Sequence, residues 1–115
     1  MATGTIQKNM VLLWENPNPS ASFAAQTINL DLNNYQAVIV VFRVRTDGGW
    51  GRVSSFAALG YESFAVAIVW DGAQWGLGRV FTPSSDSVVF GSGINITNNG
   101  TENNRMIPEF VYGIK

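Results

Sequence analysis

The chain has 115 residues and a net charge of −1, with 13% charged and 46% hydrophobic residues. Its length fits a single domain spanning residues 1–115, which can bury a core without disulfide or metal staples. The weak charge excludes the basic stripe on which nucleic-acid binding depends, so no nucleic-acid partner is expected. No apolar run approaches the roughly 20 residues that cross a bilayer, so we expect no membrane insertion.

The chain contains neither histidine nor cysteine. This excludes Ser-His-Asp and Cys-His nucleophilic sites, structural zinc and histidine-based metal sites. We therefore predict a protein that is not an enzyme and has no catalytic residues, no metal site and no cofactor. The start of the chain also lacks the charged and apolar regions of a secretory signal.

The hydrophobic pattern repeats every two residues, which indicates strands rather than helices. After a first expected strand at residues 10–14, the clearest case is 26–32. There Ile28, Leu30 and Leu32 share one face and polar residues share the other, as in a half-buried strand.

Residues 37–45 predict a central strand, because the segment begins apolar on both faces. Towards its end Arg43 and Arg45 emerge on one face. This pattern is expected of a strand that leaves the core at its end.

Residues 64–70 place large side chains on one face and small ones on the other. The large face holds Phe64, Val66, Ile68 and Trp70, and the small face holds Ala65, Ala67 and Val69. We expect this strand to be covered on both faces, with close approach on the alanine side. Its outer face, with the small alanines, is also a candidate subunit contact.

Further strands are expected at residues 52–59, 75–82, 87–90, 94–97 and 110–114. Glycine, proline and asparagine clusters separate them at the spacing of a sandwich or barrel. The predicted fold is an all-β, antiparallel β-sandwich, jelly-roll-like, with about eight or nine strands. An immunoglobulin-type sandwich is the second choice, although its Cys…Trp…Cys core is missing.

The carboxylates have ordinary explanations. Asp47 and Asp71 open turns, where aspartate is favoured, and Asp31 and Glu109 alternate onto polar strand faces. A glycan hydrolase that uses two carboxylates is an alternative, and it requires two acids flanking a cleft.

The four tryptophans divide into two pairs. Trp14 and Trp70 have apolar neighbours and are expected in the core. Trp50 and Trp75 each follow a turn and have small or polar neighbours. An aromatic ring beside a loop can stack on a sugar or contact a partner; alternatively, the two rings fold down and cap the open end of the sandwich.

The candidate ligand-binding residues are Trp50, Arg52, Asp71 and Trp75. They combine two rings with one positive and one negative side chain near two turns. We predict that they form the binding site of a non-catalytic module.

Both ends of the sequence resemble small tail-fibre or baseplate proteins of phages and prophages of gut Firmicutes. The resemblance rests on residues 12–19 (LLWENPNP), 23–32 (FAAQTINLDL) and the ending 107–115 (IPEFVYGIK), with weaker similarity at 79–82 and 88–91. It covers nearly the whole chain except residues 46–59.

The resemblance implies the head domain of a receptor-binding or tail-fibre protein. Such a head would be a homotrimer that binds a cell-surface saccharide, made in the bacterial cytoplasm and located in the virion tail. A purely structural virion or tail connector without a ligand is the alternative.

Overall fold

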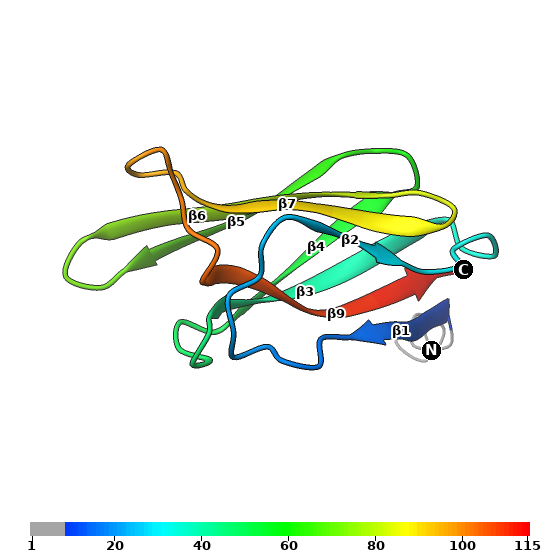
Figure 1. Cartoon of the computed structure of the whole chain (residues 1–115), viewed down its shortest axis with the longest axis horizontal. Coiled ribbons are helices and arrows are strands. Elements are labelled where there is room, and N and C mark those ends of the chain that lie inside the picture. The colour runs from blue at the N-terminus through cyan, green and yellow to red at the C-terminus, as the bar shows by residue number, and fades with distance from the viewer. Residues whose placement is uncertain (1–8) are drawn as a thin grey trace.

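A computed structural model describes residues 9–115, which form two antiparallel β-sheets packed face to face (Figure 1). The first sheet has the order β1 (Met10–Glu15), β9 (Arg105–Ile114), β3 (Ala37–Arg45) and β4 (Arg52–Ala58). The second has the order β2 (Gln26–Asn29), β7 (Ser87–Asn95), β6 (Gln74–Pro83) and β5 (Ser63–Trp70), and β8 (Gly100–Thr101) pairs with β7. The predicted β-sandwich is confirmed.

The pairing of the outer strands is jelly-roll-like. β1 pairs with the last strand, β9, and β2 pairs with β7, so distant parts of the chain lie side by side. β9 also pairs with β3 on its other side. The neighbours β3 and β4, β5 and β6, and β6 and β7 are consecutive strands joined as hairpins. No helix within residues 9–115 is both long and apolar enough to span a membrane.

The core lies between the sheets and receives every second side chain of the long strands. In β3, Val38, Val40, Phe42 and Val44 are buried, and the arginines alternate outward as predicted. At the centre, the Phe42 ring lies 5.6 Å from the Phe81 ring, measured between centroids. Burying side chains of this size supplies the main stabilisation of the fold.

One charge lies inside the sandwich. The guanidinium of Arg79, on β6, donates hydrogen bonds to the carbonyl oxygens of Met106 at 2.8 Å, Gly91 at 2.7 Å and Arg105 at 3.2 Å. Its Cζ also lies 5.4 Å from the centre of the Phe23 ring. Burial lowers the pKa of Arg79 to about 10, which leaves it charged at neutral pH.

The prediction that both faces of residues 64–70 are covered is wrong, whereas the close approach on the alanine side is confirmed. Because the alanines face inward, they are not part of an outer subunit contact. Ala65 and Ala67 are buried, and the large side chains lie outside, so Trp70 is 77% exposed instead of being in the core. The reason is that β4 and β5 are adjacent edge strands of opposite sheets, joined by a hydrogen bond of 3.2 Å between the hydroxyls of Ser55 and Ser63. Only small side chains fit between sheets that approach so closely.

Two strand boundaries also differ from the prediction. The segments 87–90 and 94–97 belong largely to one strand, β7, because Gly91–Gly93 passes through a bulge opposite Val80 rather than through a turn. The expected strand at 26–32 ends at Asn29. Beyond it, the N–H groups of Leu30 and Leu32 still donate to carbonyl oxygens of the 84–86 loop.

Candidate functional site

Three loops meet at one end of the sandwich: residues 46–51, 71–73 and 96–99 (Figure 1, left). The indole Nε1 of Trp50 donates a hydrogen bond to Asp71 Oδ2 at 3.3 Å. The rings of Trp50 and Trp75 lie 5.7 Å apart between centroids, at 44°. The structure thus brings together three of the four residues predicted to form the site, although 21 residues separate Trp50 from Asp71.

The loop before Trp50 is built around Asp47. Its carboxylate accepts the Gly49 N–H at 2.9 Å and pairs with Arg45 at 2.7 Å. The Gly49 hydrogen bond is the main cause that lowers the pKa of Asp47. These contacts turn the chain tightly and leave Trp50 at φ 67°, a left-handed conformation that is rare for a bulky residue and costs about 1–3 kcal/mol.

Contacts of the Trp50 ring compensate for that conformation. The guanidinium Cζ of Arg45 lies 4.9 Å from the ring centre, and that of Arg105 lies 5.5 Å away. Such cation–π contacts are each worth about 0.5–1 kcal/mol at partly exposed sites. Trp50 is half-buried against the core, so its ring holds the loops together at this end, as the capping interpretation expects.

Arg52 is directed elsewhere. On the outer face of the first sheet it stands opposite Arg43, and both guanidiniums pair with the nearly buried carboxylate of Glu109. The hydrogen bond from Arg52 is the main cause that lowers the pKa of Glu109, and the same bond raises the pKa of Arg52. Two like charges facing each other across strands require such a carboxylate, which explains why Arg52 does not contact the tryptophans.

A hollow of about 220 Å³ opens beside Trp75. It is lined by Ala73, Gln74, Trp75, Asn95, Thr97 and Asn98. Asn95 is committed to the loop, because its Oδ1 accepts the Thr97 N–H at 3.0 Å. The side-chain amide of Gln74 and the Nδ2 of Asn98 form no hydrogen bonds within residues 9–115, so both can face a ligand.

The indole N–H of Trp75 is buried and has no acceptor among residues 9–115. A buried donor without a partner is costly, and ordered water or a ligand often satisfies it. Because this N–H is closed off from solvent, a molecule in the hollow would meet the Trp75 ring and not the indole nitrogen.

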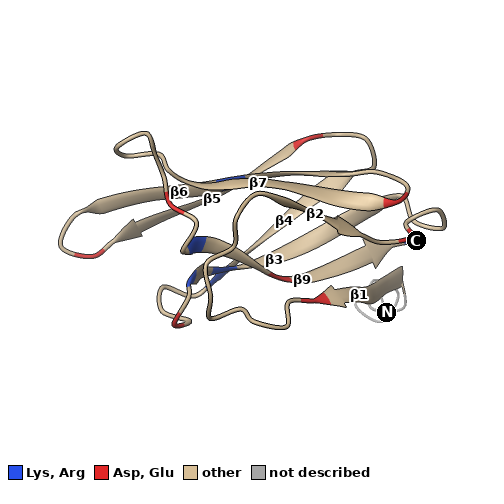
Figure 2. Ribbon diagram, in the orientation of Figure 1, with Lys and Arg blue, Asp and Glu red and all other residues tan. Residues whose placement is uncertain are grey.

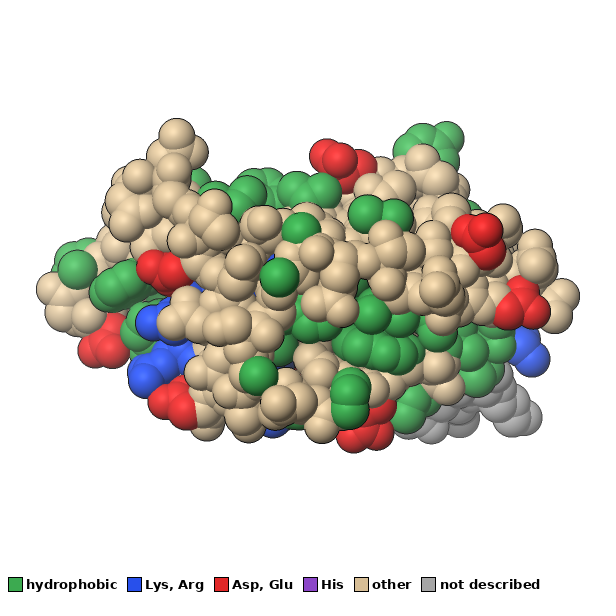
Figure 3. Space-filling view, viewed as in Figure 1, with side chains coloured by type: hydrophobic (Ala, Val, Ile, Leu, Met, Phe, Trp, Pro, Cys, Tyr) green, Lys and Arg blue, Asp and Glu red, His purple; other side chains and the backbone are tan. Residues whose placement is uncertain are grey.

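Every carboxylate at this end is engaged in holding the loops. Asp71 accepts from Trp50, Asp47 pairs with Arg45, and Glu102 lies 3.7 Å from Arg105. Acidic and basic side chains accordingly lie close together here (Figure 3). In the part of the chain that the structure describes, no three acidic, histidine or cysteine side chains gather as a metal site would require.

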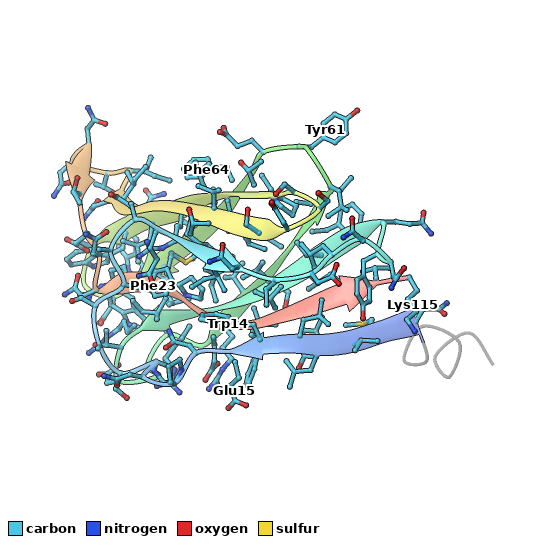
Figure 4. The ribbon with its side chains drawn as sticks, turned by 45° about the vertical axis from the view of Figure 1, so that its right-hand side comes forward. Trp14, Glu15, Phe23, Tyr61, Phe64 and Lys115 are labelled. Carbon is cyan, nitrogen blue, oxygen red and sulfur yellow. The ribbon has the colours of Figure 1, made fainter. Side chains whose placement is uncertain are left out.

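A second hollow, of about 350 Å³, lies beside Trp14 and Phe23. Both residues are labelled in Figure 4. The Trp14 ring packs 6.3 Å from the Phe23 ring and 6.5 Å from the Phe90 ring, so it is half-buried against the core, near where it was predicted. The amide of Asn16 is already bonded to the Pro108 carbonyl and the Asn18 N–H. The side chains of Asn18 and Ser22, which also line this hollow, form no hydrogen bonds within residues 9–115, so free polar groups do not distinguish the two hollows. The hollow beside Trp75 differs by its place among the loops that bring Trp50, Asp71 and Trp75 together.

Sequence reasoning missed four contributors to the site: Arg45, Arg105, Gln74 and Asn98. Nothing local in the sequence indicates that the loop at 96–99 folds against the hairpin containing Trp75. Comparisons with protein-family models, with curated proteins and with solved structures gave no match.

Proposed function

We propose that this domain is a non-catalytic module that binds a saccharide in the hollow beside Trp75. The observation that carries the proposal is an indole ring next to the free side-chain amide of Gln74 and the free Nδ2 of Asn98. Pyranose sugars present an apolar face that stacks on aromatic rings, and hydroxyls that pair with amides. The hollow is small enough to suit one or two sugar units rather than a long chain.

The resemblance to tail-fibre and baseplate proteins supplies the biological setting of this proposal. A receptor-binding head in a virion tail meets saccharides on the surface of a bacterial cell. A single small hollow binds weakly, but several copies held together in a homotrimer would bind a surface much more strongly through multivalency. The proposal therefore combines a weak saccharide site on each chain with self-association of the chains.

The test is a glycan array of bacterial surface saccharides, followed by calorimetric titration of the best ligand. We expect Trp75→Ala and Gln74→Ala to weaken binding at least tenfold, because they remove the ring and an amide. Tyr61→Ala is the matched control. Its ring is exposed in the loop between β4 and β5, away from the tryptophan end (Figure 4), and binding should not change.

The alternative of a structural connector predicts a different outcome. A connector would show no saccharide binding on the array while the protein remains folded and assembled. Equal affinity of the wild type, Trp75→Ala and Gln74→Ala would show that the saccharide does not bind beside Trp75.

A further inference from the structure

The second sheet is almost free of charge. Across β2, β5, β6, β7 and β8, Arg79 is the one charged residue, and it is fully buried. In Figure 2 the other charged positions of this layer fall in its loops. A sheet face in contact with water ordinarily carries charged side chains, so this outer face is unusual.

Large apolar side chains stand on that face. Along β5, Phe64 and Val66 are exposed, Ile68 is 63% exposed, and Trp70 is the most exposed of the four. Figure 4 shows Phe64 on the outer side of the sheet. Three large side chains and a valine in alternate positions make a continuous apolar row.

Glycines make the neighbouring strand flat. The Phe64 ring covers Gly78, where a Cβ would lie 2.4 Å from Phe64 Cε1. Ile68 and Ile96 lie on either side of Gly76 in the same way, at 3.7 and 3.4 Å from its Cβ position. The result is a low, flat apolar surface rather than a set of isolated side chains.

β5 is also an edge strand: its backbone pairs with β6 on one side, and within residues 9–115 no strand pairs with its backbone on the other, where β4 makes the single Ser55–Ser63 hydroxyl contact. Proteins protect exposed edges with lysine, proline or inward charges. The eight residues of β5 contain none of these devices. A strand of this kind is stable against aggregation when another protein surface covers it.

The size of the surface indicates what covers it. A large side chain presents about 150–250 Å² when free, so the exposed fractions leave roughly 450 Å² of apolar surface on β5 alone. The exposed Ile96 and the half-buried Val80 and Ile94 extend it. A standard interface removes about 800 Å² from each partner, and this face supplies the apolar centre of one.

We propose that the outer face centred on Phe64, Val66, Ile68 and Trp70 contacts another copy of this chain. The proposal rests on the self-association named in the proposed function, and it is independent of the saccharide. A flat, uncharged surface suits a like surface, because no charge is desolvated and no charge repels its copy. Trp70 pairs with Gln74 across the hairpin, so this contact reaches the edge of the hollow beside Trp75.

The test is the mass of the protein in solution, measured by sedimentation velocity and light scattering at micromolar concentration. We expect the wild type to run as a multiple of the 12.5 kDa chain, and Ile68→Lys and Val66→Lys to run as folded monomers. Phe56→Lys is the matched control. Phe56 is 60% exposed on the outer face of the other sheet, and its replacement should leave the mass unchanged.

Three results would overturn the proposal: a monomeric wild type, an unchanged mass in both β5 variants, or equal dissociation by Phe56→Lys. Thermal unfolding of each variant shows whether it is folded. Saccharide titration of the same samples separates the two proposals. A monomer that binds saccharide refutes only the contact face, and an oligomer that binds none refutes only the saccharide.

Discussion

Arg79 and Glu109 show how single residues tie distant parts of this chain together. Arg79, on β6, is bonded to carbonyl oxygens of β7 and β9, and Glu109, on β9, neutralises arginines of β3 and β4. Both are saturated with partners, which is the condition under which a buried charge is tolerated. Neither role is visible in the sequence, because the partners are up to 66 residues away.

Replacing Arg79 with methionine should destabilise the protein strongly. The change leaves the carbonyls of Met106, Gly91 and Arg105 without their donors inside the sandwich, at a cost of about 3–5 kcal/mol in the free energy of unfolding. Urea denaturation followed by tryptophan fluorescence measures it. Arg45→Met is the control, and a half-exposed pair of this kind should cost about 1 kcal/mol or less.

If the two substitutions lower the free energy of unfolding by the same amount, the hydrogen bonds from Arg79 to the three carbonyls add no stability of their own. The comparison is matched, since both variants lose the same side chain and gain the same one.

Glu109 gives the protein a stability that depends on pH. Its pKa in the fold is below the usual value, so its contribution is complete above about pH 4.3 and is lost as the pH falls through the lowered pKa. Glu109→Gln should cost about 1–2 kcal/mol at pH 7, because Arg43 and Arg52 then face each other unneutralised. The difference from the wild type should shrink in urea denaturations below pH 4.

Glu62→Gln, in the loop between β4 and β5, is the control and should follow the wild type at every pH. A Glu109→Gln difference that stays constant down to pH 3 would contradict the ion-pair explanation.

At the scale of the strand, the period of two predicted most of the elements, but it did not show which face of β5 is covered. Alternation in 64–70 shows that the two faces differ, and the apolar residues on each of them led us to expect that both are covered. The alanines lie inside because β4 and β5 converge at one edge of the sandwich, a tertiary constraint with no local signal. For the same reason the alternation correctly predicted β3, whose inner face lies at the centre where large residues fit.

The candidate site shows the same division. Two turns each followed by a tryptophan correctly indicated that Trp50 and Trp75 lie beside loops. The contact between the two rings depends on how the two sheets pack, which the sequence does not show. The same holds for Arg52, which pairs with Glu109 instead of contacting the tryptophans.

Two glycines of β7 provide a test of close packing within this element. A Cβ on Gly93 would lie 2.2 Å from the Glu102 carbonyl oxygen and 2.9 Å from Arg79 Nη2, whereas the nearest atom to a Cβ on Gly91 is 3.6 Å away. Gly93→Ala should therefore destabilise the protein by about 2–3 kcal/mol through overpacking. Gly91→Ala should be neutral or stabilising by about 0.5 kcal/mol, because alanine loses less entropy in a strand.

Differential scanning calorimetry of both variants measures the change. Equal melting temperatures for Gly93→Ala and Gly91→Ala would contradict the close approach of the Glu102 carbonyl and the Arg79 guanidinium to Gly93.

For the whole molecule, the order of the strands determines where the fold is held most firmly. β3 and β9 are central in the first sheet, and β6 and β7 are central in the second. The four edge strands, β1, β4, β2 and β5, have one hydrogen-bonded neighbour each on their sheet path. β1 pairs with β9, so segments from opposite ends of residues 9–115 lie side by side in one sheet.

Native-state hydrogen exchange should follow that order. We expect the slowest amides in β3, β6, β7 and β9, because they exchange only when the sandwich unfolds, and faster exchange in the edge strands β4 and β5. In a monomer, β4 and β5 should be similar, since both are edge strands of comparable length. Assembly through the outer face of β5 slows exchange in β5 and its hairpin with β6 but leaves β4 fast. Exchange measured by mass spectrometry on the wild type and on Ile68→Lys therefore separates the effect of strand position from that of coverage by a second copy. Protection of β5 that persists in the monomeric variant comes from the fold itself. Protection that disappears in this variant comes from the second copy.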